Sequence, residues 1–322
     1  MTHSGPPAAR QRISSALTLA VYADWLCTPD SVPSHAVAQL LTLTRHLATG
    51  GVDEDRLAGE LATTVWEQPE GQARSGTQQI LAAVATGAAW WEAAPAYRNG
   101  AGGWGSDAAV RAGAAGLLPG SGVGAVAQIG RRSAAVTHTH PDARDAAAIH
   151  AAAVSLAAAD GDFEILDTDK LLAVLTEQSR GATMRAQLAL VRQLGRDRAT
   201  PEETAKVLGC GRSACGAAGA ALAAYLICPR EPLAAIAFAH QMGPDWHAAA
   251  LMTATIGGAH NPRARPPVTW SLPPALKPQV VDVASRLAAA PPAVSRHYRR
   301  VSGFPAPARF SATAGPVVTQ LS

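Results

Sequence analysis

Residues 134–141 read AAVTHTHP, and residues 237–247 read AFAHQMGPDWH. In both stretches an alanine-rich segment runs into a short polar turn that contains histidine and proline. Alanine has the highest intrinsic helix propensity, because its side chain loses no conformational entropy in a helix. The two stretches therefore predict helices joined by short turns that carry the chemically reactive side chains.

The rest of the chain has the same character. Of its 322 residues, 48% are hydrophobic, 16% are charged and only 5% are aromatic. This length and composition suffice for a sizeable core, in one large domain or two smaller ones, and exclude a disordered protein. No segment shows a run of period-two strand pattern, so we expect an all-α fold, a single orthogonal helical bundle.

The expected helices are separated by breakers, mostly glycine, proline or an acidic capping residue. Neither a fixed-period repeat nor a proline-rich or charged linker divides the middle of the chain. We therefore predict one domain at residues 12–290, a flexible N-terminal tail at 1–11 and a proline-rich C-terminal tail at 291–322. The predicted helices span residues 12–26, 34–48, 54–66, 76–91, 108–117, 122–137, 142–159, 169–194, 201–208, 215–228, 231–242, 246–257 and 278–289.

The charge and cysteine content exclude several classes of protein. A net charge of +3 comes from scattered basic residues, which is typical of solvated faces, so we expect no nucleic-acid partner. The four cysteines lack Cys-x-x-Cys spacing and are interpreted as reduced core thiols. Residues 11–23 resemble a signal peptide, but the serines and threonine in the run favour an amphipathic first helix. We expect a cytoplasmic protein without a membrane span.

A glycine pattern at residues 122–127, GVGAVA, fits the dinucleotide-binding motif by its letters, with Asp142 downstream. That motif requires a preceding strand and a parallel sheet. Residues 119–121, Pro-Gly-Ser, stand where the strand would be. We therefore discount a nucleotide site of this type.

The order and spacing of several segments resemble the ADP-ribosylglycohydrolase family over residues 13–290. The opening helix keeps Asp24, Leu26 and Pro29 of the family's G-x-A-x-G-D-A-L-G-x-P pattern. The family holds magnesium with acids from two motifs. At the first, Thr/Ser-Asp-Asp-Thr, this chain has Pro-Ser-His-Ala-Val at residues 33–37, so both acids are missing. At the second, G-G-D-T-D-T, it has Gly-Pro-Asp-Trp-His-Ala at 243–248.

Two further segments carry the resemblance to the family's ligand pocket. Residues 105–111, Gly-Ser-Asp-Ala-Ala-Val-Arg, match the family's G-N-G-x-x-M-R loop and helix. The best-preserved match is Thr-His-Thr-His-Pro at 137–141, whose neighbourhood contacts ADP-ribose in the family. The resemblance and the neighbouring tryptophans predict these ligand-binding residues: Trp104, Gly105, Ser106, His138, His140 and Trp246.

The substitutions change the expected cofactor. Magnesium takes oxygen ligands in octahedral geometry and is poorly held by imidazole, so the residues do not favour the family's two-magnesium site. His35, Asp245 and His247 together suggest a transition-metal site instead. The alternative is that these histidines only line a pocket, and we favour it because a fourth ligand is missing.

Ribosyl-bond cleavage without a metal needs a carboxylate for the oxocarbenium-like state and an acid for the leaving group. We predict Asp24, Asp107, Asp245 and His247 as catalytic residues. His35, His138 and His140 are further candidates for the acid. The alternatives are that Asp107 and Asp245 are helix N-caps, and that Trp104 and Trp246 pack in the core.

The leading hypothesis is therefore a glycosidic-bond hydrolase that acts on an ADP-ribose-related or nucleoside-type small molecule through a rebuilt, magnesium-free site. A second hypothesis is a catalytically inactive protein that binds such a ligand or a protein partner. A third, a purely structural helical scaffold, predicts no pocket at all.

Overall fold

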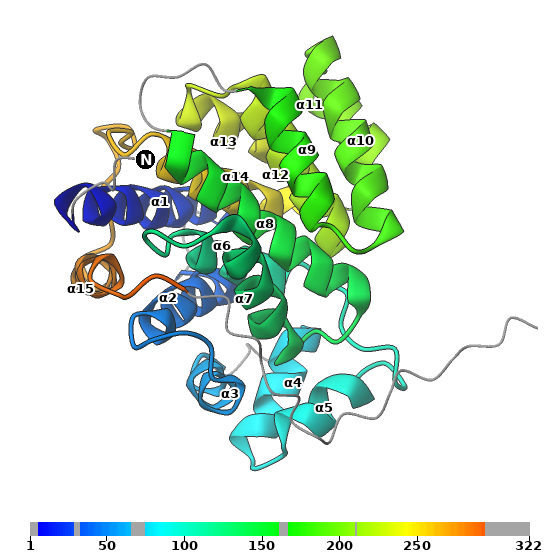
Figure 1. The fold of residues 1–322 in the computed structure, drawn as a ribbon, viewed down its shortest axis with the longest axis vertical. Helices are drawn as coiled ribbons and strands as arrows, with labels where there is room; N and C mark the ends of the chain where they lie inside the picture. The colour runs from blue at the N-terminus through cyan, green and yellow to red at the C-terminus, as the bar shows by residue number, and fades with distance from the viewer. Residues whose placement is uncertain (1–5, 29–32, 66–74, 161–166, 210, 294–322) are drawn as a thin grey trace, which may run out of the picture.

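A computed structural model describes residues 6–28, 33–65, 75–160, 167–209 and 211–293. Within these residues the fold is all-α, as expected (Figure 1), and no described helix is both long and apolar enough to cross a membrane. The helices are α1 (Pro6–Cys27), α2 (His35–Leu47), α3 (Glu54–Ala62), α4 (Gly76–Ala85), α5 (Trp90–Ala96), α6 (Asp107–Gly116), α7 (Val123–Ala135), α8 (Pro141–Asp160), α9 (Thr168–Gln178), α10 (Ala182–Asp197), α11 (Pro201–Leu208), α12 (Ala214–Ile227), α13 (Pro232–Gln241), the 3-10 turn η1 (Pro244–Trp246), α14 (His247–His260) and α15 (Lys277–Ala288).

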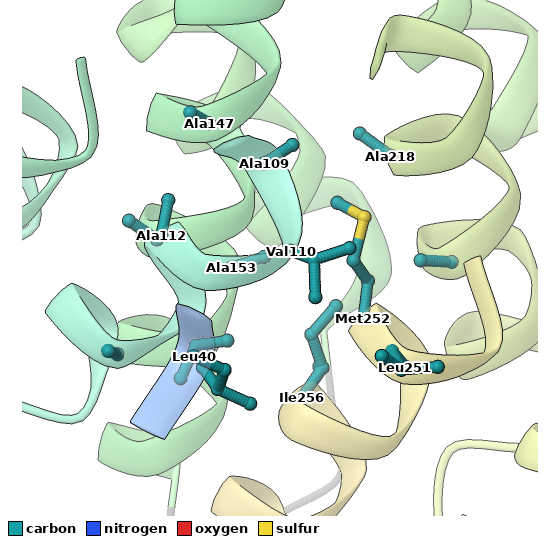
Figure 2. Close-up of a cluster of buried hydrophobic side chains, with 14 of the residues drawn as sticks. Leu40, Ala109, Val110, Ala112, Ala147, Ala153, Ala218, Leu251, Met252 and Ile256 are labelled. Atoms are coloured by element: carbon teal, nitrogen blue, oxygen red, sulfur yellow. The ribbon is translucent and has the colours of Figure 1, made fainter. Parts of the chain in front are cut away.

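The core lies where α1, α6, α8, α12 and α14 pack together. Figure 2 shows Val110 of α6 facing Met252 and Ile256 of α14, with alanines of α6, α8 and α12 around them. Helices α9, α10 and α11 pack along one side of this centre, and α3, α4 and α5 lie at the opposite end (Figure 1). Alanine-rich faces let the central helices approach closely, so the core is built from small side chains at short spacing.

Glycine makes two of these helix crossings possible. A Cβ on Gly130 of α7 would lie 2.7 Å from the carbonyl oxygen of Ala147 in α8. A Cβ on Gly258 of α14 would lie 2.6 Å from Cα of Ala16 in α1. No side chain fits at such distances, so α7 packs on α8 and α14 on α1 backbone to backbone.

Several predicted boundaries are confirmed. Ser34 caps α2, since its side chain accepts a hydrogen bond from the backbone N–H of Val37. Helix α11 spans residues 201–208, as predicted. The first helix begins earlier than predicted, at Pro6, so residues 6–11 of the expected tail are helical. Residues 1–5 and 294–322 of the predicted tails lie outside the described residues.

The single helix predicted over residues 169–194 is wrong, because the chain turns between α9 and α10. The buried carboxylate of Asp145 accepts hydrogen bonds from the Ser179 hydroxyl and from the backbone N–H groups of Arg180 and Gly181. These bonds replace helical ones, so a residue from α8 ends α9 at Gln178. The helix predicted over 76–91 likewise stops at Ala85 and resumes as α5.

Candidate functional site

The ends of α1, α2 and α14 meet at the carboxylate of Asp24. This residue is 2% exposed. Its Oδ1 lies 2.8 Å from Nε2 of His247, the first residue of α14, and its Oδ2 accepts the backbone N–H of Ser34 at 2.8 Å. Asp24 therefore joins residues 33–37 to residues 243–248, the two segments predicted to stand in place of acidic motifs.

His247 is held by Asp24 but stays accessible. Its side chain is 29% exposed. When Nε2–H donates to the carboxylate, the other ring nitrogen, Nδ1, is left as an acceptor. A buried carboxylate that fixes the orientation and tautomer of a partly exposed imidazole is the arrangement of a general base. The predicted catalytic residues Asp24 and His247 thus lie together.

A second polar group lies between α2, α6 and the segment before α8, around the fully buried guanidinium of Arg111. Its Nη1 donates to Oε1 of Gln39, and its Nη2 donates to Oγ1 of Thr137, both at 2.6 Å. Gln39 also hydrogen-bonds His35, one turn earlier in α2. Thr137 Oγ1 lies 2.8 Å from Nδ1 of His138. Because the Thr137 hydroxyl oxygen accepts from Arg111, we assign its O–H as the donor to Nδ1 of His138. Nδ1 is then the acceptor, and the proton of the neutral ring lies on Nε2.

The histidines of this group are neutral at physiological pH. Burial and, to a smaller extent, the charge of Arg111 lower the pKa of His138 to about 4, against the opposing effect of Asp107. Burial also lowers the pKa of His35. Burial reduces the pKa of Arg111 to about 10, so this guanidinium keeps its charge. His138 therefore acts as a neutral N–H donor at this position and does not supply a proton.

Asp107 opens α6 beside this group and is half-buried. It interacts electrostatically with His35, His138 and Arg111. Its predicted alternative role as an N-cap is wrong, because the N-cap of α6 is Ser106, whose side chain makes no capping hydrogen bond. A partly exposed carboxylate next to two neutral imidazoles is available to stabilise a positive charge on a bound molecule.

The glycine-rich loop before α6 forms one wall of a cavity of about 320 Å³. The carbonyl of Trp104 accepts the backbone N–H of Ala214, and Gly105 pairs with Ser213, so the loop is tied to the start of α12. The Trp104 ring also carries the guanidinium of Arg98, 5.2 Å from its centroid. Two predicted ligand-binding residues, Trp104 and His140, thus line one cavity. The lining residues are Trp104, His140, Asp142, Thr183, Ser213, Ala214 and Cys215.

The other predicted residues of the loop lie between the cavity and the buried group. A Cβ on Gly105 would be 3.7 Å from Nε2 of His138, so this backbone passes close to the imidazole. Ser106 follows at the start of α6 and is half-buried. Gly105, Ser106 and His138 are therefore neighbours.

A model of the ADP-ribosylglycohydrolase family matches residues 9–295. The chain belongs to the ADP-ribosylglycohydrolase family. Among solved structures it is similar to an "ADP-ribosylglycohydrolase-related protein complex", with 17% identity and a TM-score of 0.63, over 88% of this chain and 98% of that chain. At this identity the likeness shows the fold alone. No curated protein sequence matches the chain.

In this member of the ADP-ribosylglycohydrolase family, residues 243–248, predicted to correspond to the second acidic motif, include Asp245 and Trp246. Asp245 points to solvent, with its side chain 65% exposed and 3.4 Å from Nε of Arg212. The next residue, Trp246, is 5% exposed and packs on Gly211 in the core. The short turn η1 sends these neighbours in opposite directions. Asp245 is neither the N-cap, which is Gly243, nor a partner of His247.

The structure does not bring together the predicted metal set of His35, Asp245 and His247. In the described part of the chain, no three His, Cys, Asp or Glu side chains come together as metal ligands. His35 bonds within the Arg111 group and His247 bonds to Asp24. Asp24 of α1 faces inward beside residues 33–37 and 243–248, and both its oxygens are engaged. This donor set does not fit magnesium, which requires several oxygen ligands.

Three residues at the site were not predicted from the sequence as functional. Gln39, Arg111 and Thr137 form the hydrogen-bonded link between His35 and His138. A signal existed for Gln39, because it lies four residues after His35 and so on the same face of α2. Arg111 has the same spacing from Asp107 in α6.

Proposed function

We propose that this protein hydrolyses a ribosyl glycosidic bond of an ADP-ribose-related or nucleoside-type small molecule without the magnesium of its family. His247, oriented by Asp24, is the general base. The observation that carries the proposal is the 2.8 Å contact between Nε2 of His247 and the buried carboxylate of Asp24. It supplies an activated, accessible imidazole at a motif where the family has acids.

The proposed chemistry combines the dyad with residues of the polar group around Arg111. Nδ1 of His247 takes a proton from water, the water oxygen bonds to the anomeric carbon, and the bond to the leaving group breaks. The protonated imidazole then returns the proton to the leaving group. Asp107 supplies negative charge to the oxocarbenium-like state, and neutral His138 offers its Nε2–H to a ligand oxygen.

The cavity beside Trp104 supports a ligand of small-molecule size. Its volume of about 320 Å³ lies at the lower end of the range for small-molecule sites. The indole of Trp104 offers an aromatic face on which a nucleobase can stack. His140, on the opposite segment, offers a polar group to the same ligand.

A second candidate function is binding without turnover. Two observations favour it: Asp24 is almost fully buried, and the pKa of His138 near 4 removes the nearest acid from proton transfer. A site that keeps its ligand contacts but has one available carboxylate, Asp107, binds a glycoside without cleaving it. This protein would recognise ADP-ribose-like molecules as a sensor or carrier.

The two candidates are distinguished by incubating the protein, in EDTA, with ADP-ribosylated peptides, ADP-ribose derivatives and nucleosides. Hydrolysis predicts release of a ribose-containing product, with a loss of roughly 100-fold or more in kcat for His247→Ala. The matched control is Asp245→Ala, which removes an exposed carboxylate two residues away and leaves kcat unchanged. Saturable binding without product in the wild type supports the second candidate. If the wild type neither binds these molecules nor releases a product, both candidates are contradicted.

A further inference from the structure

Within the described residues, the guanidinium of Arg111 forms hydrogen bonds to neutral groups only. Nη1 donates to Oε1 of Gln39, and Nη2 donates to Oγ1 of Thr137 and to the backbone oxygen of Ser133. Asp107 acts on it by charge but forms no ion pair with it among these residues. A cation that is buried away from water without an ion-pair partner is costly. Packing alone therefore does not account for an arginine at this position.

Arginine differs from its neighbours in this group because it can only donate hydrogen bonds. A glutamine amide, a hydroxyl and a neutral imidazole can each donate and accept. The atom of Gln39 that faces Arg111 must therefore be its oxygen, so its NH2 group faces Nε2 of His35. Nε2 then accepts, and the proton of this neutral ring lies on Nδ1.

The same constraint has the opposite effect on His138. Oγ1 of Thr137 accepts from Arg111, so its O–H is directed to Nδ1 of His138 and the ring proton lies on Nε2. This Nε2 lies 3.7 Å from the position of a Cβ on Gly105 and forms no hydrogen bond within the described residues. His35 and His138 thus carry their protons on opposite ring nitrogens, and both assignments follow from one guanidinium.

We propose that Arg111 is a positioning residue that sets the proton on both imidazoles, at Nδ1 in His35 and at Nε2 in His138. It acts through Gln39 and Thr137 and does not need to touch a ligand. The consequence for recognition rests on the proposed function: a ligand atom that meets Nε2 of His138 must carry a lone pair, as a hydroxyl oxygen, a ring oxygen or an aromatic nitrogen does. An N–H group at that point finds no acceptor and is disfavoured.

The alternative is that Arg111 only braces α2, α6 and α7. A brace holds the helices but fixes no proton, so the two roles differ in what they predict for His35. A neutral histidine ring in water prefers its proton on Nε2. A proton on Nδ1 of His35 therefore requires a cause, and His35 is the sharper of the two readouts.

The test is imidazole 15N NMR of the full chain with 15N-labelled histidine at about pH 7.5, where both rings are neutral. Protonated and bare ring nitrogens have well-separated 15N shifts, and each ring is assigned by the loss of its signals in His35→Gln or His138→Gln. We expect a bare Nε2 and a protonated Nδ1 in His35, and the reverse in His138.

Gln39→Glu tests the link to His35 at nearly constant size. The carboxylate accepts from Arg111 but has no N–H to donate, so Nε2 of His35 should become protonated and its bare-nitrogen signal should be lost. The matched control is Gln78→Glu in α4, a buried glutamine whose oxygen accepts the N–H of Ser75. A glutamate accepts that bond equally well, so both rings should keep the wild-type signals.

Arg111→Gln tests the guanidinium itself. A glutamine at this position can donate or accept, so the amide of Gln39 loses its fixed orientation. The bare Nε2 signal of His35 should then weaken or disappear. If this variant does not fold, Gln39→Glu still decides the question.

Two results would overturn the proposal: a wild type in which the proton of His35 lies on Nε2, or a folded Gln39→Glu variant with unchanged His35 signals. ADP-ribose then tests the ligand part, because a lone pair that binds Nε2–H of His138 shifts that proton resonance. Bound ADP-ribose that leaves the resonance in place contradicts this contact. If ADP-ribose does not bind, the ligand part fails together with the proposed function, whereas the tautomers are decided by the spectra without ligand.

Discussion

Asp24 of α1 and Asp245 of η1 show how two aspartates close to His247, one in space and one in sequence, have different surroundings. Asp24 is buried and accepts bonds from a backbone N–H and an imidazole. Asp245 is largely exposed and faces an exposed arginine. An inward, fixed carboxylate can orient a base, whereas an exposed ion pair contributes little to stability or chemistry.

This difference predicts unequal effects on folding. Asp24→Ala should lower the free energy of unfolding by roughly 1–3 kcal/mol, because Ser34 N–H loses its buried acceptor and His247 its partner. Asp245→Ala should change it by no more than about 0.5 kcal/mol. Urea unfolding measures both. Equal losses for the two variants would contradict the assigned geometry.

At the level of helices, the sequence predicted most elements but not the bends between them. Alanine content and capping residues located α2, α11 and α12 to within a residue, because those signals are local. The turn between α9 and α10 depends on Asp145 of α8, which is distant in sequence. The opposite directions of Asp245 and Trp246 depend on Gly211, whose missing side chain admits the indole.

The close crossing of α7 and α8 gives a prediction at this scale. Gly130→Ala should destabilise the protein by roughly 1–3 kcal/mol, because its Cβ would meet the carbonyl of Ala147. Gly195→Ala, in α10, is the matched control: nothing lies within 4 Å of its Cβ. Alanine there should stabilise the helix by about 0.5–1 kcal/mol. Thermal unfolding of both variants checks the signs, and a stabilising Gly130→Ala would refute the crossing.

For the whole molecule, buried neutral histidines predict how stability depends on pH. Burial lowers the pKa of both His138 and His150 from 6.5 to about 4. Between these values the unfolded chain binds more protons than the folded one, so the free energy of unfolding falls as pH falls through this window. The stability that comes from burying the two histidines in neutral form is fully present above about pH 6.5.

Urea unfolding at about pH 7.5 and about pH 5 measures this loss. His150→Gln should show a smaller difference between the two conditions, because a neutral amide does not titrate. A wild type that is equally stable, or more stable, at the lower pH would show that these side chains are not buried in neutral form.

The candidate site was only partly predictable from the sequence. Asp24, His247, Trp104 and His140 were expected from motif positions, and the fold brings them together in two pairs. The hydrogen-bonded link through Arg111 was not expected, because the sequence does not show which distant groups a buried guanidinium will bond.

The measurement that tests this account most directly is the rate of ribosyl-bond hydrolysis by the wild type, in EDTA and in excess magnesium. If the dyad of Asp24 and His247 is the base, the two rates are equal and both fall roughly 100-fold or more in His247→Ala. Hydrolysis that appears only with magnesium, or that persists in His247→Ala, would contradict it.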